Sequence, residues 1–306
     1  MLGLSFEYFE HLFLQSEMKT FYINLTKIQP SQLYICKEKL AKIEAEIETA
    51  ELTEIKPLPI KRIGSHLFFT DGHTRAFALF QKGVKEVKVY IDTDELNWLH
   101  YFICIGWCKQ AKILYIGNLQ NRVIPNQIYE EKWLQLCQKM HREVETVNHN
   151  FFRVQLIEDN IEKSDIINEI LRSLSQWFGI EKAIQEYVDG VKDCTFITMN
   201  INRIPIGFIA LTSHNKYTSE IYVMGIYQEF HRYGFGKQLV TRAIQMLQAE
   251  GKKFLTVKTL SATHPDPNYR KTREFYRAMG FYPLEEFSEL WGKENPCLFM
   301  VKKLDE

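Results

Sequence analysis

The chain has 306 residues, of which 45% are hydrophobic and 25% are charged, the proportions of a globular protein long enough for two ordinary domains. Its 38 basic and 38 acidic side chains give a formal net charge of zero. No strong field therefore favours nucleic acid or a membrane surface as a partner of the whole chain.

The first residues of the chain and its cysteines indicate the cellular compartment that we expect for the protein. Glu7 and Glu10 stand where a secretory signal peptide carries basic residues. The sequence contains no apolar run long enough to span a membrane. The six cysteines do not follow the spacing of a small disulfide scaffold. We therefore expect a cytoplasmic protein with reduced thiols.

The first half of the chain is predicted to alternate short strands and helices, from the spacing of its apolar residues. The expected strands are 21–28, 57–61, 66–70 and 86–91, and the expected helices are 37–49, 74–82, 97–112 and 126–142. The polar run 143–150 is expected to end this half, which gives domains 1–148 and 149–306.

One motif in this half lies between a predicted strand and a predicted helix. It reads Thr70-Asp71-Gly72-His73-Thr74-Arg75. Asp71 is interpreted either as the cap of the helix or as part of a phosphate-binding turn to which His73 and Arg75 add donors and charge.

Over about residues 20–92 this segment resembles the ParB/sulfiredoxin-like fold, whose members bind nucleotide phosphates at this turn. The resemblance implies a small α+β domain with a nucleotide-binding turn formed by Asp71, Gly72, His73, Thr74 and Arg75. The cysteine nucleophile of sulfiredoxin has no counterpart in the turn, so that chemistry is not expected. No helix-turn-helix or basic stripe follows, which disfavours nucleic acid. A structural turn without a ligand remains the alternative.

Two pairs of soft ligands at helical spacing suggest a metal: Cys104 with Cys108, and Cys137 with His141. Zinc sites more often use tight-turn spacings of about two residues between cysteines. Cysteine is also often buried for packing alone. We therefore predict no metal site.

A strand, a glycine-bearing turn and a helix are predicted from residue 220 to residue 251. The turn reads His231-Arg232-Tyr233-Gly234-Phe235-Gly236-Lys237. The first amides of a helix have no partner inside it, and together with the helix dipole they form a seat for an anion. Glycine lets the backbone approach a phosphate closely. Gly225, inside the strand, indicates a bulge or a close backbone approach.

A second motif reads Thr272-Arg273-Glu274-Phe275-Tyr276-Arg277-Ala278-Met279-Gly280-Phe281 and predicts a helix closed by Gly280. The two motifs, in this order, resemble the GNAT superfamily of N-acetyltransferases. That family has Arg/Gln-x-x-Gly-x-Gly/Ala after its fourth strand and Tyr-x-x-x-Gly-Phe later in the chain. The resemblance covers roughly the last half of the sequence. It implies an α/β domain with a twisted mixed sheet, helices on both faces, and acetyl-CoA bound where two parallel strands splay.

The resemblance also implies the cofactor-binding residues. Backbone groups of Met224 and Ile226 are expected to pair with the pantetheine arm. The diphosphate is expected at the turn formed by His231, Arg232, Tyr233, Gly234, Phe235, Gly236 and Lys237. His231 replaces the usual Arg or Gln, and Arg232 and Lys237 are interpreted either as phosphate ligands or as solvated cations. Tyr269 replaces an asparagine that contacts the cofactor in many members.

Two side chains are expected to move protons in this chemistry. Glu220 has the offset from Gly234 at which histone-type members carry a basic glutamate, and Tyr276 has the position of a tyrosine that protonates the departing thiolate. The alternatives are a water-facing glutamate on an edge strand, with a water chain as the base, and a tyrosine that only packs under the sheet.

The acceptor is expected near residues 177–180, an aromatic and nearly uncharged segment that in this family lines the acceptor mouth. Such a lining favours a small or partly apolar amine, although simple packing explains it equally well. The predicted function is acetyl transfer from acetyl-CoA to a primary amine of a small molecule or peptide. The alternatives are a nucleotide-binding protein acting through residues 71–75, and a non-catalytic binding module.

Overall fold

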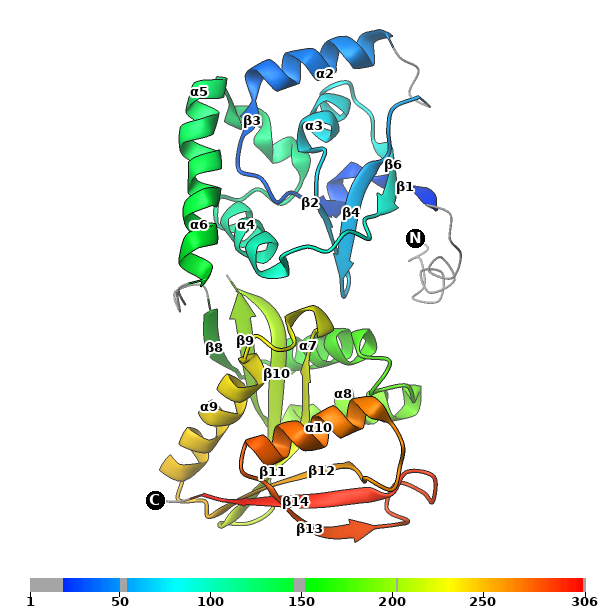
Figure 1. The fold of residues 1–306 in the computed structure, drawn as a ribbon, viewed down its shortest axis with the longest axis vertical. Helices are drawn as coiled ribbons and strands as arrows, with labels where there is room; N and C mark the ends of the chain where they lie inside the picture. Colours follow the sequence, from blue (N-terminus) through cyan, green and yellow to red (C-terminus); the bar gives the residue numbers. More distant parts are fainter. Residues whose placement is uncertain (1–18, 50–53, 146–151, 202, 305–306) are drawn as a thin grey trace. The chain divides into compact units, whose positions relative to one another are not determined.

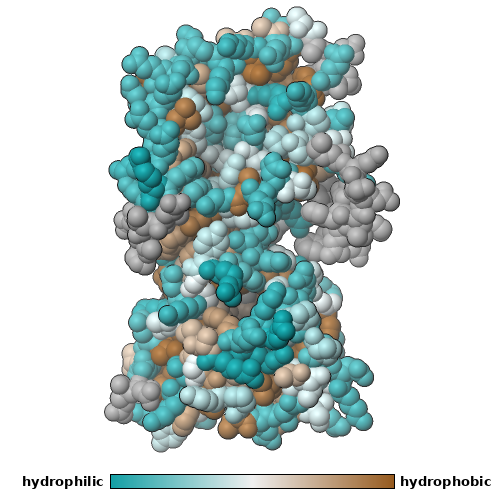
Figure 2. All heavy atoms as spheres, in the orientation of Figure 1, coloured by the Kyte–Doolittle hydropathy of each residue, from teal (hydrophilic) through white to brown (hydrophobic). Residues whose placement is uncertain are grey.

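The computed structural model describes residues 19–49, 54–145, 152–201 and 203–304. The chain forms two compact units, residues 1–148 and 149–306. Figure 1 shows both units, each with its own sheet and helices. On the face drawn in Figure 2, hydrophobic residues form separate small patches among hydrophilic ones. None of the helices described here has the length and apolar character needed to cross a bilayer.

The first unit is built on a five-stranded mixed sheet with the order β1-β6-β4-β5-β2. Its strands are β1 (Thr20–Asn24), β2 (Ile28–Gln29), β4 (Leu58–Ile63), β5 (His66–Phe69) and β6 (Glu86–Ile91). Its helices are α2 (Lys37–Thr49), α3 (His73–Gln81), α4 (Trp98–Gln110), α5 (Asn126–Tyr129) and α6 (Gln135–Glu145), with a 3-10 segment η3 (Ile116–Arg122). Two short strands, β3 (Ile35–Cys36) and β7 (Val123–Ile124), pair in parallel outside this sheet.

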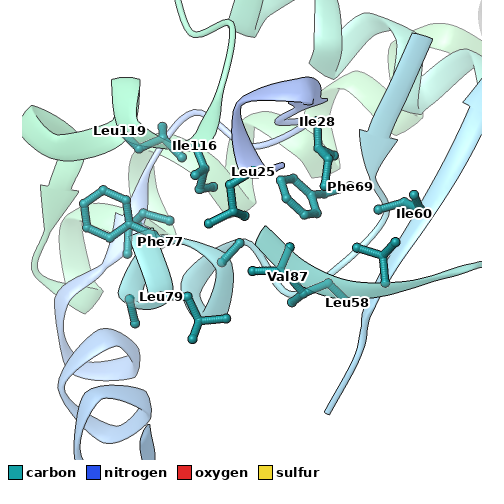
Figure 3. Packing of buried hydrophobic residues seen from close by; sticks show 14 of the residues in the cluster. Leu25, Ile28, Leu58, Ile60, Phe69, Phe77, Leu79, Val87, Ile116 and Leu119 are labelled. Atoms are coloured by element: carbon teal, nitrogen blue, oxygen red, sulfur yellow. The ribbon is translucent and has the colours of Figure 1, made fainter. Parts of the chain in front are cut away.

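The core of the first unit lies where the sheet, α3 and η3 meet. Leu25, Phe69, Phe77 and Ile116 are almost fully buried and belong to one hydrophobic cluster. Figure 3 shows their side chains converging from four different segments. Burial of such side chains supplies the main driving force for folding. The unit therefore has a core of its own.

The expected helix 37–49 and the expected strand 86–91 are confirmed by α2 and β6. The continuous strand 21–28 is wrong. The Asn24 side chain accepts a hydrogen bond from the Thr26 amide at 2.9 Å and starts a 3-10 turn, Leu25–Lys27, which divides the strand into β1 and β2. The expected helix 126–142 is interrupted by a π-helical segment, Glu130–Leu134, and continues to Glu145.

The second unit contains a seven-stranded sheet with the order β13-β14-β12-β11-β10-β9-β8. Its strands are β8 (Phe152–Ile157), β9 (Thr195–Ile201), β10 (Ile204–Ser213), β11 (Thr218–Ile226), β12 (Phe254–Leu260), β13 (Tyr282–Phe287) and β14 (Cys297–Lys303). Its helices are α7 (Asn160–Ser173), α8 (Glu181–Gly190), α9 (Phe235–Ala249) and α10 (Pro267–Ala278). The β11–β12 pair is parallel, and the other neighbours in this sheet are antiparallel.

Helices cover both faces of this sheet. A Cβ at Gly225 would lie 3.1 Å from Ile170 of α7, whereas the methyl of the preceding residue, Met224, lies beside Gly236 of α9. Because successive strand residues point to opposite faces, α7 and α9 lie on opposite sides of β11. This arrangement is the mixed sheet with flanking helices that the sequence predicts for the second unit.

The two parallel strands separate part-way along their length. β11 and β12 are paired from Thr218↔Phe254 to Ile221↔Val257, and beyond that point each strand continues without the other. On its opposite edge β11 stays paired with β10 up to Ile226, with one irregularity that leaves Tyr222 unopposed. The bulge therefore lies at Tyr222, while Gly225 is a point of close approach, as its short distances to α7 show.

Candidate active site

The turn between β11 and α9 is held in a left-handed conformation at two positions. Gly234, the N-cap of α9, has φ 82° and ψ 2°, and Arg232 has φ 69°. A side chain at Gly234 would meet no atom within 4 Å, so the backbone angle, and not space, favours glycine there. At Gly236 the reverse holds, because a Cβ would lie 3.2 Å from Phe275 and 3.3 Å from Met224.

The amides of this turn are available. The first bond inside α9 runs from the Gln238 amide to the Gly234 carbonyl at 3.1 Å. In the described part of the chain, none of the amides from Arg232 to Lys237 donates a hydrogen bond. Free amides at a helix N-terminus, combined with the helix dipole and left-handed residues, form a seat for an anion.

The extended backbone of β11 lies next to this anion-binding turn. From Tyr222 to Ile226 the edge of β11 that faces β12 has no strand partner among the described residues. Unpaired strand groups accept an extended chain as a further strand does. Ile226 was expected to pair with the pantetheine arm. Its carbonyl is already engaged, because it accepts a hydrogen bond from Nε2 of His231 at 2.8 Å. Met224, whose methyl lies beside Gly236, remains at the opening.

The side chains of the turn differ in their roles. Burial lowers the pKa of His231, and its ring lies edge-on to Trp177 at 5.5 Å, so it fixes the end of β11 as a neutral group. Arg232 and Lys237 are exposed. The exposed ring of Tyr233 stacks on Phe235 with their centroids 6.0 Å apart. Two cations and one aromatic face thus surround the free amides.

Tyr276 lies on α10 with its ring buried, 6% exposed, between Phe275 and Phe281. Burial raises the pKa of this phenol, so it carries its proton at neutral pH. Its hydroxyl has no hydrogen-bond partner among the described residues, yet it is not one of the unpaired atoms that are sealed from solvent. The phenol is therefore protonated, and its hydroxyl makes no hydrogen bond to another described residue.

α10 is fastened to the loop between α7 and α8. Asp266 caps the helix by accepting hydrogen bonds from the Asn268 and Tyr269 amides at 2.7 and 3.0 Å. The Tyr269 hydroxyl donates to the Trp177 carbonyl at 2.8 Å, and the Trp177 indole donates to Thr272 at 3.2 Å. Tyr269 is therefore engaged with the loop, and Trp177 lies beside α10.

Glu220 lies where β11 and β12 are still paired. Its residue is 6% exposed, so the interpretation as a water-facing glutamate is wrong. Both carboxylate oxygens accept hydrogen bonds from the Lys258 ammonium at 2.8 Å, and Oε2 also lies 2.8 Å from Nε2 of His214. Glu220 and Lys258 thus form a charge-assisted pair across β11 and β12.

Residues 165–281 match the model of the acetyltransferase (GNAT) family. The second unit contains a GNAT acetyltransferase domain. The match includes the turn, Glu220 and Tyr276.

Solved structures similar to this chain come from several bacteria. A GNAT-family acetyltransferase from Desulfovibrio desulfuricans is 14% identical, with a TM-score of 0.44 over 50% of this chain and 99% of its own. The aminoglycoside 6'-N-acetyltransferase from Enterococcus faecium is 15% identical, with a TM-score of 0.41 over 50% and 98%. The yncA protein of Salmonella typhimurium, solved with acetyl-CoA, is 15% identical, with a TM-score of 0.39 over 51% and 96%. No curated protein sequence matches the chain.

Three residues of the GNAT domain near Glu220 were not singled out from the sequence: Lys258, His214 and Tyr187. Lys258 stands inside an apolar strand, and a charge in such a run signals a buried partner. The ring of Tyr187 lies 5.3 Å from that of Tyr222. Burial raises the pKa of Tyr187 to about 12, with Tyr222 and Glu220 adding to the effect. No local pattern marks His214 or Tyr187, because His214 reaches Glu220 across the β10–β11 turn and Tyr187 of α8 meets Tyr222 of the distant strand β11.

The motif of the first unit lies at the N-terminus of α3, as expected. Asp71 is not the cap, because Gly72 holds that position with φ 75° and no side-chain hydrogen bond closes the turn. His73 is 5% exposed, and its Nε2 accepts a hydrogen bond from the Ser31 amide at 3.0 Å. Burial lowers the pKa of His73 to about 4. His73 therefore faces the core, which leaves Asp71, Thr74 and Arg75 as the exposed or half-buried side chains of the motif.

The cysteine and histidine pairs lie on α4 and α6. The rings of His100 and His141 stack with centroids 4.1 Å apart. Across the described residues, no group of three or more His, Cys, Asp or Glu side chains is arranged to hold a metal ion.

Proposed function

We propose that the GNAT domain transfers the acetyl group of acetyl-CoA to a primary amine of a small molecule or peptide by direct attack on the thioester. One observation carries this proposal: the backbone amides from Arg232 to Lys237 donate no hydrogen bond within the described residues, and they lie beside the unpaired edge of β11. A diphosphate fits the amides, and a pantetheine arm, which is extended and carries amides, fits the strand edge. Arg232 and Lys237 add positive charge at the same place.

Positioning is the first contribution of these residues. With its diphosphate on the turn and its arm along β11, the co-substrate directs its thioester into the gap where β11 and β12 diverge. Holding the thioester against the amine converts a bimolecular step into an effectively unimolecular one. The amine nitrogen attacks the carbonyl carbon, the C–S bond breaks, and CoA leaves as a thiolate that needs a proton.

We assign that proton to Tyr276. Its phenol is protonated at neutral pH, its hydroxyl is unpaired, and it lies on α10, which packs beside the Gly236 end of α9. A positioned acid of this kind contributes roughly 10²- to 10⁴-fold to a rate. The amine must also lose a proton, and two routes are proposed for it. Glu220 accepts it directly, or water takes it from an amine that reaches the site uncharged.

Two measurements test the proposal. Acetyl-CoA at about 100 times its dissociation constant stabilises a native protein by roughly 2.7 kcal/mol, so the thermal unfolding of the second unit should shift upward. Free CoA thiol should then appear when a panel of amines is added. An unchanged unfolding temperature at saturating acetyl-CoA would contradict the proposal.

A further inference from the structure

Three polar contacts hold the carboxylate of Glu220. Lys258 donates to both of its oxygens at 2.8 Å, and the ring of His214 lies at the same distance from one of them. The side chains of Glu220 and Lys258 are 7% and 31% exposed, so water screens this pair weakly. A carboxylate that already holds an ammonium has little capacity left for a second one.

Among the described residues, four titratable groups around this pair add no negative charge to it. They are Tyr187 of α8, Tyr222 of β11, Cys297 of β14 and His214, which follows β10. Burial raises the pKa of Tyr187 to about 12 and that of the Cys297 thiol to about 11, and it raises the pKa of Tyr222 as well. All three are therefore neutral near pH 7.

Two other acids act electrostatically on tyrosines of this region: Glu186 on Tyr187, and Asp266 on Tyr269. Glu186 is exposed on α8, with Lys182 at 3.8 Å. Asp266 accepts two amides of α10. Glu186 thus faces a lysine and Asp266 accepts backbone amides, so neither of these two acids is an unpaired carboxylate.

Amines differ greatly in how much of the neutral form they supply. An α-amino group has a pKa of about 7.7–8.0, and a lysine ε-amine has a pKa of about 10.4. At pH 7.5 roughly a third of the first is uncharged, but only about one part in 800 of the second. In the supply of neutral amine, a site without an available base therefore favours the α-amine by a factor of roughly a few hundred.

We propose that Lys258 is a specificity-determining residue of the GNAT domain: by pairing with Glu220 it restricts the acceptor to weakly basic α-amines and disfavours the ε-amine of lysine. This inference rests on the proposed function. In the native protein Glu220 then balances the charge of Lys258 and takes no proton from the acceptor. The amine must therefore reach the site uncharged. Removing the Lys258 cation would return Glu220 to use as a base.

The test uses the full chain, acetyl-CoA and matched acceptors, with thiol release followed from pH 6.5 to 9.5. One peptide has a free α-amine and no lysine, and its partner has a blocked N-terminus and a single lysine. Glycine amide serves as a small-molecule α-amine. At pH 7.5 the α-amine peptide should react at least 100-fold faster than the lysine peptide, and the ratio should fall as the pH rises.

Variants at Lys258 separate the charge from other effects. In Lys258→Met the ratio should fall at least tenfold, because the freed Glu220 accepts a proton from the ammonium. Lys258→Arg keeps the cation and should keep the wild-type ratio. Should Lys258→Met fail to fold, the double variant Glu220→Gln/Lys258→Met removes both charges, and it should retain the preference for the α-amine.

The outcomes distinguish this inference from the function on which it rests. A wild-type protein that acetylates the lysine peptide as fast as the α-amine peptide overturns it, and so does an unchanged ratio in Lys258→Met. A double variant that loses the preference for the α-amine also overturns it. Acetyl-CoA stabilisation without turnover of any α-amine overturns it as well. Absence of both stabilisation and thiol release rejects the proposed function itself.

Discussion

Gly234 and Gly251 lie at opposite ends of α9, and both hold positive φ angles, 82° and 76°. At neither position would a Cβ meet an atom within 4 Å. The two glycines are therefore matched in backbone conformation and in space. Only Gly234 belongs to the turn whose amides are free. Replacing each by alanine separates the cost of backbone strain from the loss of a binding site.

The size of each effect follows from the backbone angle. An L-residue in the left-handed region costs about 1–2 kcal/mol. Alanine also lowers the conformational entropy of the unfolded chain, and this offsets about 0.4–1 kcal/mol of the cost. Each variant should thus lose about 1 kcal/mol, which lowers the unfolding temperature of a domain of this size by about 2–4 °C.

Affinity for acetyl-CoA should distinguish the two variants. Relief of strain at Gly234→Ala turns the neighbouring amides away from the diphosphate, and a hydrogen bond to a charged group contributes about 1.5–3 kcal/mol. The dissociation constant of acetyl-CoA should rise at least tenfold, about 1.4 kcal/mol, in Gly234→Ala and stay unchanged in Gly251→Ala. Calorimetric titration of both variants measures this difference. Equal affinities would refute the assignment of the turn as the diphosphate site.

Three further outcomes are expected. Tyr276→Phe should lower kcat about 100-fold while the affinity for acetyl-CoA stays the same, since the lost hydroxyl acts on the leaving thiolate; an unchanged kcat removes Tyr276 from the mechanism. Tyr269→Phe, which removes the bond to the Trp177 carbonyl, should cost about 1 kcal/mol in the unfolding of the second unit. His73, with its pKa near 4 in the folded state against about 6.5 when unfolded, makes no contribution above pH 6.5 and destabilises the first unit by up to about 3 kcal/mol as the pH falls to 4. Denaturant unfolding at several pH values checks this. In His73→Gln the free energy of unfolding should fall less between pH 6.5 and pH 4.

The glycine turn was predictable because its signals are local. Gly234 and Gly236 mark a strand-to-helix turn, and the apolar spacing that follows fixes the helix to which it belongs. The same holds for α2 and β6, whose periodicities are regular over their whole length. Local chemistry also explains the error at residues 21–28, where an Asn24 cap overrides an apolar strand pattern.

The contact of Glu220 with Lys258 was not predictable, because it joins residues far apart in the sequence. Lys258 is 38 residues away and reaches Glu220 through the parallel pairing of β11 with β12. His73 is a similar case in the first unit. A histidine in a turn between Asp71 and Arg75 suggests an exposed ligand, but the Ser31 amide, 42 residues away, provides the partner that allows its burial.

Amide hydrogen exchange with and without acetyl-CoA tests the central claim most directly. In the described structure the amides from Arg232 to Lys237 donate to no protein group, so they should exchange rapidly in the free protein. Saturating acetyl-CoA should slow exchange in the segment 232–237 and along β11 from Tyr222 to Ile226, and should leave α3 of the first unit unchanged. Exchange in 232–237 that is equally fast with acetyl-CoA bound would contradict the account.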